Sequence, residues 1–263
     1  MINLSLAGKT AIVCGSSQGI GKAAAMELAA LGANIILIAR NLSALELVRE
    51  KLPTEEGQKH YALSADFDHP EELKGKVDKF LEKIHEIHIL VNNTGGPTPG
   101  PAIDAHEDEF RIAFNRHLIC NQIMVQAVLP KMKSGGYGRI INVISTSVKQ
   151  PIPNLGVSNT VRGAVANWSK TLSLELGKFG ITVNNVLPGS TSTGRLEAII
   201  TGNANKKQLS TKDVEAAMLK EVPIGRFATP EEIAYAIAFL ASPAAAYING
   251  INLPVDGGRT ASL

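Results

Sequence analysis

The sequence predicts an α/β fold, with one doubly wound parallel sheet and helices on both of its faces. Short segments that are apolar on both faces alternate with longer amphipathic segments, which is the pattern of a parallel sheet covered on two sides. A glycine-rich turn follows the first apolar segment. No linker rich in Pro, Gly and Ser divides the 263 residues. We therefore expect a single domain spanning residues 1–263.

Seven short apolar segments are expected to form the strands. Each is only a few residues long and has apolar side chains at successive positions, so both of its faces are expected to be buried. The predicted strands are residues 10–14, 34–39, 60–65, 87–92, 139–144, 181–187 and 248–255.

The segments between these strands have helical periodicity and recognisable ends. Gly32 is placed to terminate the first helix. Ser43 with Glu46, and Thr229 with Glu232, have the spacing of a capping box, in which two residues satisfy each other's backbone N–H groups. The predicted helices are residues 22–31, 43–51, 70–84, 110–132, 158–178 and 230–240.

Residues 190–227 break the alternation of strands and helices. The segment is long and richer in polar residues than its surroundings. Segments of this length between regular elements are usually lids or binding loops. We expect this segment to act as a substrate lid.

The composition argues against several classes of partner. With 26 basic and 24 acidic residues the formal net charge is +2, so neither nucleic acid nor an anionic membrane is an expected partner. No apolar run reaches the roughly 18 residues of a membrane span. Cys14 and Cys120 lie far apart, and a reducing, cytoplasmic location is expected. His85 and His88 lack a third ligand, so no metal site is predicted.

The glycine-rich turn predicts a Rossmann-type nucleotide site. Glycines spaced G-x3-G-x-G stand between the first strand and the first helix. Such a turn allows close approach of a pyrophosphate, and the helix N-terminus offers free N–H groups and a positive dipole end. The cofactor-binding residues expected here are Gly15, Ser17, Gln18, Gly19, Ile20 and Gly21.

The end of the second strand predicts which dinucleotide binds. In dinucleotide-binding folds this region often carries an acid that binds the ribose 2′-hydroxyl. Here it holds Ala39 and then Arg40. No carboxylate is present to repel a 2′-phosphate, and a guanidinium is available to pair with one. The sequence therefore favours NADP(H) over NAD(H).

Further motifs identify a family resemblance that covers nearly the whole chain. They are Asn92-Asn93-Thr94-Gly95, Pro188-Gly189 followed by Thr191 and Thr193, and Val255-Asp256-Gly257-Gly258. With the glycine turn, they resemble the short-chain dehydrogenase/reductase (SDR) superfamily, nearest to its 3-oxoacyl-ACP-reductase-like branch. The resemblance implies further cofactor contacts at Asp66, Phe67, Asn93, Thr94, Gly95, Arg162, Pro188, Gly189, Thr191 and Thr193.

The catalytic residues that the resemblance implies depart from the family pattern. The family uses an Asn, a Ser, and a Tyr-x-x-x-Lys on one helix. Asn115 and Ser145 match the first two, but the positions of Tyr and Lys hold Ser158 and Arg162. The four tyrosines, Tyr61, Tyr137, Tyr235 and Tyr247, all lie elsewhere. A serine hydroxyl is a much weaker acid than a phenol, and arginine stays protonated.

Three interpretations remain open. In the first, the protein is an NADP(H)-dependent oxidoreductase that interconverts a carbonyl and an alcohol, including 3-oxoacyl-type substrates, with an altered proton donor. In the second, a site on the same fold catalyses a different kind of reaction. In the third, the chain binds cofactor with little or no turnover, as a sensor or partner subunit. The retained Asn115 and Ser145 favour the first.

Some neighbouring residues have alternative roles. Lys149 and His117 are conceivable substitute acids, although each is expected to be a surface or helix residue. Ser158 also suits a helix N-cap. The family resemblance further implies a small-molecule carbonyl or alcohol substrate. It also implies a homotetramer or homodimer built on the helices at residues 110–132 and 158–178.

Overall fold

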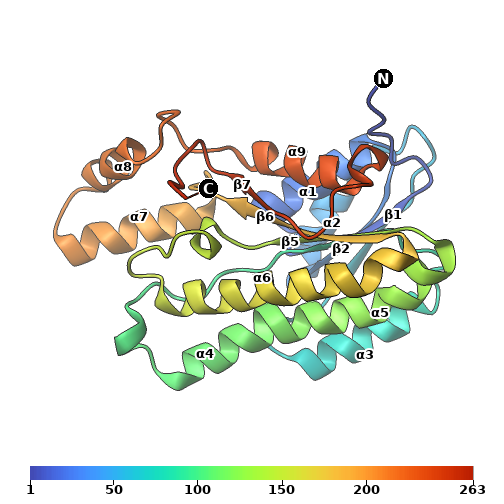
Figure 1. Ribbon diagram of the computed structural model, residues 1–263, viewed down its shortest axis with the longest axis horizontal. Coiled ribbons are helices and arrows are strands. Elements are labelled where there is room, and N and C mark those ends of the chain that lie inside the picture. Colours follow the sequence, from blue (N-terminus) through green and yellow to red (C-terminus); the bar gives the residue numbers. More distant parts are fainter. Residues whose placement is uncertain (263) are drawn as a thin grey trace.

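The protein forms a seven-stranded parallel sheet in the order β3-β2-β1-β4-β5-β6-β7. The computed structural model describes residues 1–262. The predicted doubly wound α/β fold is confirmed, with helices on both faces of the sheet (Figure 1). The strands are β1 (Thr10–Cys14), β2 (Asn34–Ala39), β3 (His60–Ser64), β4 (Ile89–Asn92), β5 (Gly138–Val143), β6 (Ile181–Pro188) and β7 (Asn252–Val255).

The helices divide between the two faces. On one face lie α1 (Gly19–Ala30), α2 (Leu42–Arg49) and α9 (Pro230–Ala241), and on the other lie α3 (Pro70–Leu81), α4 (Glu107–Phe114), α5 (Cys120–Gly135) and α6 (Gly156–Leu176) (Figure 1). Short 3₁₀ turns occur at Ala102–Asp104, Thr146–Val148, Gly177–Phe179 and Pro243–Ala245.

Strand β1 shows why the strands are apolar throughout. Ala11 and Val13 belong to the core under α1 and α9, whereas Ile12 and Cys14 belong to the core under α3 and α5. All four side chains are completely buried. Because successive side chains of a strand point to opposite faces, a strand covered on both sides favours apolar residues on both of its faces.

Several predicted helix ends differ from the structure. Helix α2 starts at Leu42, and its cap is Asn41, whose side chain accepts a hydrogen bond from the N–H of Ala44. The predicted capping box at Ser43 and Glu46 is therefore wrong. Helix α6 begins at Gly156, so Ser158 lies inside its first turn and is not the N-cap. The capping box of Thr229 and Glu232 is confirmed.

The predicted helix at residues 110–132 is not regular. It begins earlier, as α4 at Glu107, and a π-helical turn at Asn115–Ile119 separates it from α5. A π turn inserts one extra residue into the helix and rotates the side chains that follow it. The turn determines which residues of this segment face the sheet.

The segment at residues 190–227 is largely helical. It contains α7 (Gly194–Lys207) and α8 (Thr211–Lys220), so its description as a long irregular loop is wrong. The two helices pack on each other through a small apolar cluster of Leu196, Ile200, Ala204 and Val214. In Figure 1 they extend beyond the sheet at one end of the molecule.

A row of asparagine side chains crosses four adjacent strands of the sheet, from the end of β4 to the start of β7. Asn92 Nδ2 donates to Asn142 Oδ1 at 2.9 Å, and Asn142 Nδ2 donates to Asn185 Oδ1 at 3.0 Å. Asn185 Nδ2 then donates to Asn252 Oδ1 at 2.8 Å. These residues are direct neighbours in the registers of β4, β5, β6 and β7. The row adds side-chain hydrogen bonds between neighbouring strands to those of the backbone.

None of the helices within residues 1–262 combines the length and apolar character needed to cross a bilayer.

Candidate active site

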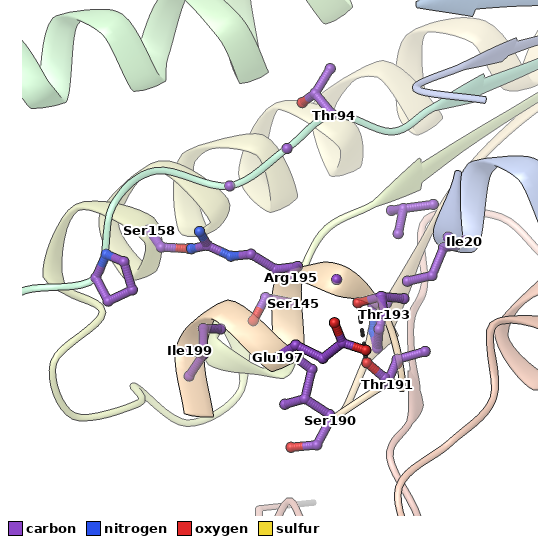
Figure 2. Close-up of a pocket in the computed structure, with 18 of the residues that line it drawn as sticks. Ile20, Thr94, Ser145, Ser158, Ser190, Thr191, Thr193, Arg195, Glu197 and Ile199 are labelled. Atoms are coloured by element: carbon purple, nitrogen blue, oxygen red, sulfur yellow. Dashed lines mark hydrogen bonds between the residues drawn. The ribbon is translucent and has the colours of Figure 1, made fainter. Parts of the chain in front are cut away.

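A cleft of about 1120 Å³ opens at the carboxyl ends of the strands. Its walls come from the loops that follow β1 to β6, from the start of α6, and from α7. Ligands of open α/β sheets bind in this place, because the loops on either side of the central strands diverge there. Figure 2 shows the part of the cleft near Ser145, Ser158 and Arg195.

The glycine turn forms one wall of the cleft. Gly15 has φ +60°, and a Cβ atom there would lie 2.5 Å from the carbonyl oxygen of Asn93. A Cβ atom on Gly21 would overlap the carbonyl oxygen of Gly15. Asn93 Nδ2 donates to the carbonyl oxygens of Cys14 and Gly15, at 3.3 Å each. The turn is thus held tightly against the loop after β4.

The N-terminus of α1 is open toward this wall. Its N-cap, Gln18, makes no side-chain capping bond, so the first N–H groups of the helix are available to a phosphate. Ser16, which sequence reasoning missed, has a structural role here, because its buried Oγ accepts a hydrogen bond from Ile38 N at 3.0 Å. Nothing in the glycine spacing signals that role.

Almost all of the predicted cofactor-binding residues line this one cleft. Of these predicted residues, Gly21 is the one that does not line the cleft. The lining residues are Gly15, Ser17, Gln18, Gly19, Ile20, Arg40, Asp66, Phe67, Asn93, Thr94, Gly95, Arg162, Pro188, Gly189, Thr191 and Thr193. Residues from six separate loops and helices of the chain therefore meet at one surface.

Arg40 lies at the end of the cleft near β2 and is free to take another partner. Its side chain is 71% exposed, and its nearest carboxylate, Asp68, is 3.8 Å away. Arg116 already holds Asp68, with Nε donating to Oδ1 at 2.6 Å. The guanidinium of Arg40 therefore remains available to an anionic ligand.

Two serine hydroxyls line the opposite end of the cleft (Figure 2). Ser145 Oγ accepts a hydrogen bond from Ser147 N at 3.1 Å, which leaves its own proton to donate. The hydroxyl of Ser158 makes no hydrogen bond with any residue of the described chain, 1–262. No tyrosine lines this cleft; the nearest in sequence, Tyr137, donates to the Ala241 carbonyl at 3.0 Å.

Arg162 lies behind the serines and is only 8% exposed. Its Nη1 donates to the Val143 carbonyl oxygen at 2.9 Å, which fixes the side chain against the end of β5. Burial lowers the pKa of Arg162 to about 10, and the positive charge of Arg195 acts in the same direction. The guanidinium remains cationic at neutral pH.

Arg195 reaches across the cleft from the first turn of α7. Its Nη2 donates to the carbonyl oxygen of Pro97, in the loop after β4, at 2.5 Å. Partial burial of the Arg195 guanidinium lowers its pKa. Sequence reasoning missed Arg195 because it belongs to no motif and lies in the segment expected to be a loop.

The structure does not bring Asn115 to the cleft. Asn115 is exposed, and its backbone carbonyl accepts the N–H of Cys120 within the π-helical turn. Two residues later, His117 is buried, with Nδ1 2.7 Å from the hydroxyl oxygen of Thr94. Burial, followed by the charges of Arg162, Arg116 and Arg195, places the pKa of His117 well below its ordinary value.

His117 therefore lies in a helix, as expected, but inside the protein and not on its surface. Its Nε2 is buried without a hydrogen-bond partner in the described chain. Lys149, the other substitute acid considered, is half-buried and does not line the cleft.

Comparisons with known proteins agree with this geometry. Residues 15–260 match the family described as enoyl-(acyl carrier protein) reductase. The 7alpha-hydroxysteroid dehydrogenase of Escherichia coli K12 is 32% identical over 261 residues, covering 99% of this chain and 98% of the relative. The 3-oxoacyl-(acyl carrier protein) reductase of Vibrio cholerae is 34% identical, with coverages of 97% and 98%.

A solved structure gives the same result in three dimensions. L-sorbose reductase from Gluconobacter frateurii, solved with NADPH and L-sorbose, has a TM-score of 0.92 and 29% identity, covering 99% of this chain and 100% of that one. A shared fold and full-length similarity to dehydrogenases and reductases support one conclusion. The chain belongs to the short-chain dehydrogenase/reductase superfamily and is an NAD(P)-dependent oxidoreductase.

Proposed function

We propose that the protein is an NADP(H)-dependent oxidoreductase that interconverts a carbonyl and an alcohol, including 3-oxoacyl-type substrates. The observation that carries the proposal is the single cleft that joins the glycine turn, Arg40, and the hydroxyls of Ser145 and Ser158. Helix α7, with the rest of residues 190–227, covers the substrate end as a lid.

The residues of the cleft fit a dinucleotide. The uncapped N-terminus of α1 and the turn from Gly15 to Gly19 suit the pyrophosphate. The exposed guanidinium of Arg40 suits a 2′-phosphate, and Asp66 suits the adenine amino group. Thr191 and Thr193, with Pro188 before them, suit the nicotinamide end. The bound cofactor supplies the hydride.

The remaining work falls to residues of this chain. The free hydroxyl protons of Ser145 and Ser158 are placed to donate to the substrate oxygen. Arg162 stays cationic and stabilises negative charge that develops there. Because a serine hydroxyl is a weak acid, Ser158 acts as a relay: it donates its proton to the substrate oxygen and takes a proton from solvent. The exposed position of Asn115 does not support a catalytic role for it.

The decisive experiment is a substrate panel with NADPH. It contains ketones, aldehydes, a 3-oxoacyl thioester and an enoyl thioester, the last because of the name of the matching family. Oxidation of NADPH by wild type with a carbonyl substrate is expected. Tight NADPH binding without turnover of any substrate would instead favour a cofactor-binding protein that acts as a sensor or partner subunit.

The double variant Ser158→Tyr/Arg162→Lys tests the atypical site directly. It restores the family's proton donor and its lysine, so turnover of simple carbonyls is expected to rise if proton transfer limits wild type. A general acid typically contributes about 10²–10⁴ in rate. An unchanged rate in this variant, with NADPH binding intact, would place the limiting step elsewhere.

We also propose a homotetramer or homodimer built on the α4–α5 segment and α6. Exposed apolar side chains lie on these helices and in the π turn between them, at Ile112, Ile119 and Leu174. Apolar groups left exposed in this way are typical of association surfaces. Sedimentation analysis is expected to show an oligomer, and Leu174→Lys is expected to shift it toward monomer.

A further inference from the structure

Two arginines of the cleft have no acidic partner. Within residues 1–262, no carboxylate oxygen lies within 4.0 Å of the guanidinium of Arg162 or of Arg195. Each donates one hydrogen bond, and both acceptors are main-chain carbonyls, of Val143 and Pro97. Both guanidiniums therefore keep most of their donors unused.

The other arginines of the cleft are different. Arg40 and Arg116 share the carboxylate of Asp68, and Arg259 Nη2 pairs with Glu221 at 2.6 Å. The absence of acidic partners is thus specific to the two arginines at the substrate end. It does not reflect a general excess of basic residues, since the chain has a net charge of only +2.

The two unpaired guanidiniums act on one region of the cleft. The charge of Arg195 lowers the pKa of Arg162, and the charges of both lower that of His117. Figure 2 shows the Arg195 side chain extending across the cleft in the direction of Ser158. Arg162 follows Ser158 by one turn of α6. Both charges therefore lie near the hydroxyl that is free for substrate.

Uncompensated positive charge in a partly closed site is unfavourable until an anion arrives. The acidic residue of the same wall, Glu197, does not supply that anion, because it makes no ion pair with either arginine. In the proposed function, the N-terminus of α1 and Arg40 bind the anionic groups of the cofactor. A negative charge on the substrate is the remaining source.

We propose that Arg195 and Arg162 bind an anionic group of the substrate, so that this protein selects carbonyl compounds that carry a carboxylate, that is, oxo acids. Arg195 approaches from the lid side and Arg162 from the wall behind Ser158, which allows the carboxylate to be held between them. The proposal rests on the proposed function as an NADP(H)-dependent oxidoreductase and names its substrate class.

The test compares two ligands of similar size and shape, one anionic and one neutral. Acetoacetate and its neutral isostere acetoacetamide are titrated calorimetrically into the complex of the protein with NADP⁺. Wild type is expected to bind acetoacetate at least tenfold more tightly. That preference is expected to shrink between about 50 mM and about 500 mM sodium chloride. Equal binding of the two ligands would overturn the proposal.

Variants of Arg195 identify the residue responsible. Arg195 is exposed, so its replacement is not expected to disturb the core. Arg195→Gln is expected to weaken acetoacetate binding about 10- to 100-fold with acetoacetamide unchanged, and Arg195→Lys to retain part of the affinity. Arg49→Gln, at a half-buried arginine of α2 that does not line the cleft, is the control and is expected to bind like wild type.

A parallel NADPH titration separates this proposal from the proposed function. If wild type does not bind NADPH, the proposed function fails, and the anion preference is then measured on the protein alone. If Arg195→Gln loses NADPH affinity as strongly as acetoacetate affinity, Arg195 belongs to the cofactor site and the proposal is wrong. Loss of acetoacetate affinity alone supports it.

Discussion

The imidazole Nδ1 of His117 lies 2.7 Å from the hydroxyl oxygen of Thr94, inside the protein and behind the cleft. This contact joins the π-helical turn of Asn115–Ile119 to the loop after β4. Burial lowers the pKa of His117, and the charges of Arg162, Arg116 and Arg195 act in the same direction, so the ring is held in its neutral form. The relationship makes the stability of the fold depend on pH in a predictable direction.

Stability is expected to fall below about pH 6.5 because of His117. The folded-state pKa is lowered from its ordinary value of 6.5, first by burial and then by Arg162, Arg116 and Arg195. In acid the unfolded chain therefore binds a proton that the folded chain does not. The contribution of His117 to the free energy of unfolding is complete above pH 6.5. It decreases by about 1.4 kcal/mol per pH unit as the pH falls toward the folded-state pKa.

Urea unfolding at about pH 7.5 and about pH 5.5 measures this effect. Wild type is expected to lose about 1.4 kcal/mol more free energy of unfolding over this range than His117→Asn, which keeps a polar side chain but does not titrate. His85→Asn, at an exposed position, is the control and should follow wild type. If His117→Asn keeps the full pH dependence, the imidazole is not held neutral.

Arg40→Ala is expected to reverse the cofactor preference. The guanidinium has no strong partner of its own, so its removal takes away a charge-assisted contact with a 2′-phosphate. We expect the Kd for NADPH to rise about 10- to 100-fold and that for NADH to change by about twofold or less. Fluorescence titration measures both constants. The NADP(H) preference would be contradicted if wild type bound NADH more tightly than NADPH and the variant bound NADH as wild type does.

The motifs predicted which residues of the glycine turn and of the loop after β4 come together in the cleft, because these motifs are local. A Cβ atom on Gly15 would collide with the Asn93 carbonyl, so this position requires glycine, and that requirement can be read directly from the sequence. The π-helical turn is different. An extra residue inserted inside a long helix leaves an amphipathic pattern on either side of it, so the sequence does not reveal the turn. The family resemblance favoured Asn115, whereas the structure turns His117 inward.

The two helices within residues 190–227 escaped prediction for a related reason. Helix α7 buries only Leu196, Ile200 and Ala204, and most of its other residues are polar or glycine. A helix with so narrow an apolar stripe resembles a loop in composition. Arg195 was missed with it, because its importance comes from reaching Pro97, a contact between residues nearly a hundred positions apart.

Ser158→Ala tests whether this hydroxyl takes part in proton transfer. Ser158 has no hydrogen bond to lose within the described chain, so its replacement should leave stability and NADPH binding unchanged. If the hydroxyl passes the proton, kcat is expected to fall about 10²-fold or more. Thr160→Ala, on the exposed side of the same helix, is the control. Unchanged turnover would remove Ser158 from the proton path and leave the oxidoreductase assignment intact.

The asparagine row predicts a large effect of a single buried substitution. Asn142 is fully buried and bonds to Asn92, Asn185 and the hydroxyl of Ser169. A leucine of similar size fills the space but leaves these three groups without partners. Each unsatisfied buried polar group typically costs about 1–3 kcal/mol, so Asn142→Leu is expected to lower the free energy of unfolding by about 3 kcal/mol or more.

Urea unfolding of Asn142→Leu, with Asn167→Leu at an exposed position of α6 as the control, measures this loss. The control is expected to stay within about 0.5 kcal/mol of wild type. Because the row joins β4, β5, β6 and β7 just below the cleft, NADPH binding should weaken in Asn142→Leu even under conditions where the protein stays folded. A variant as stable as wild type would mean that the asparagines contribute no net stability.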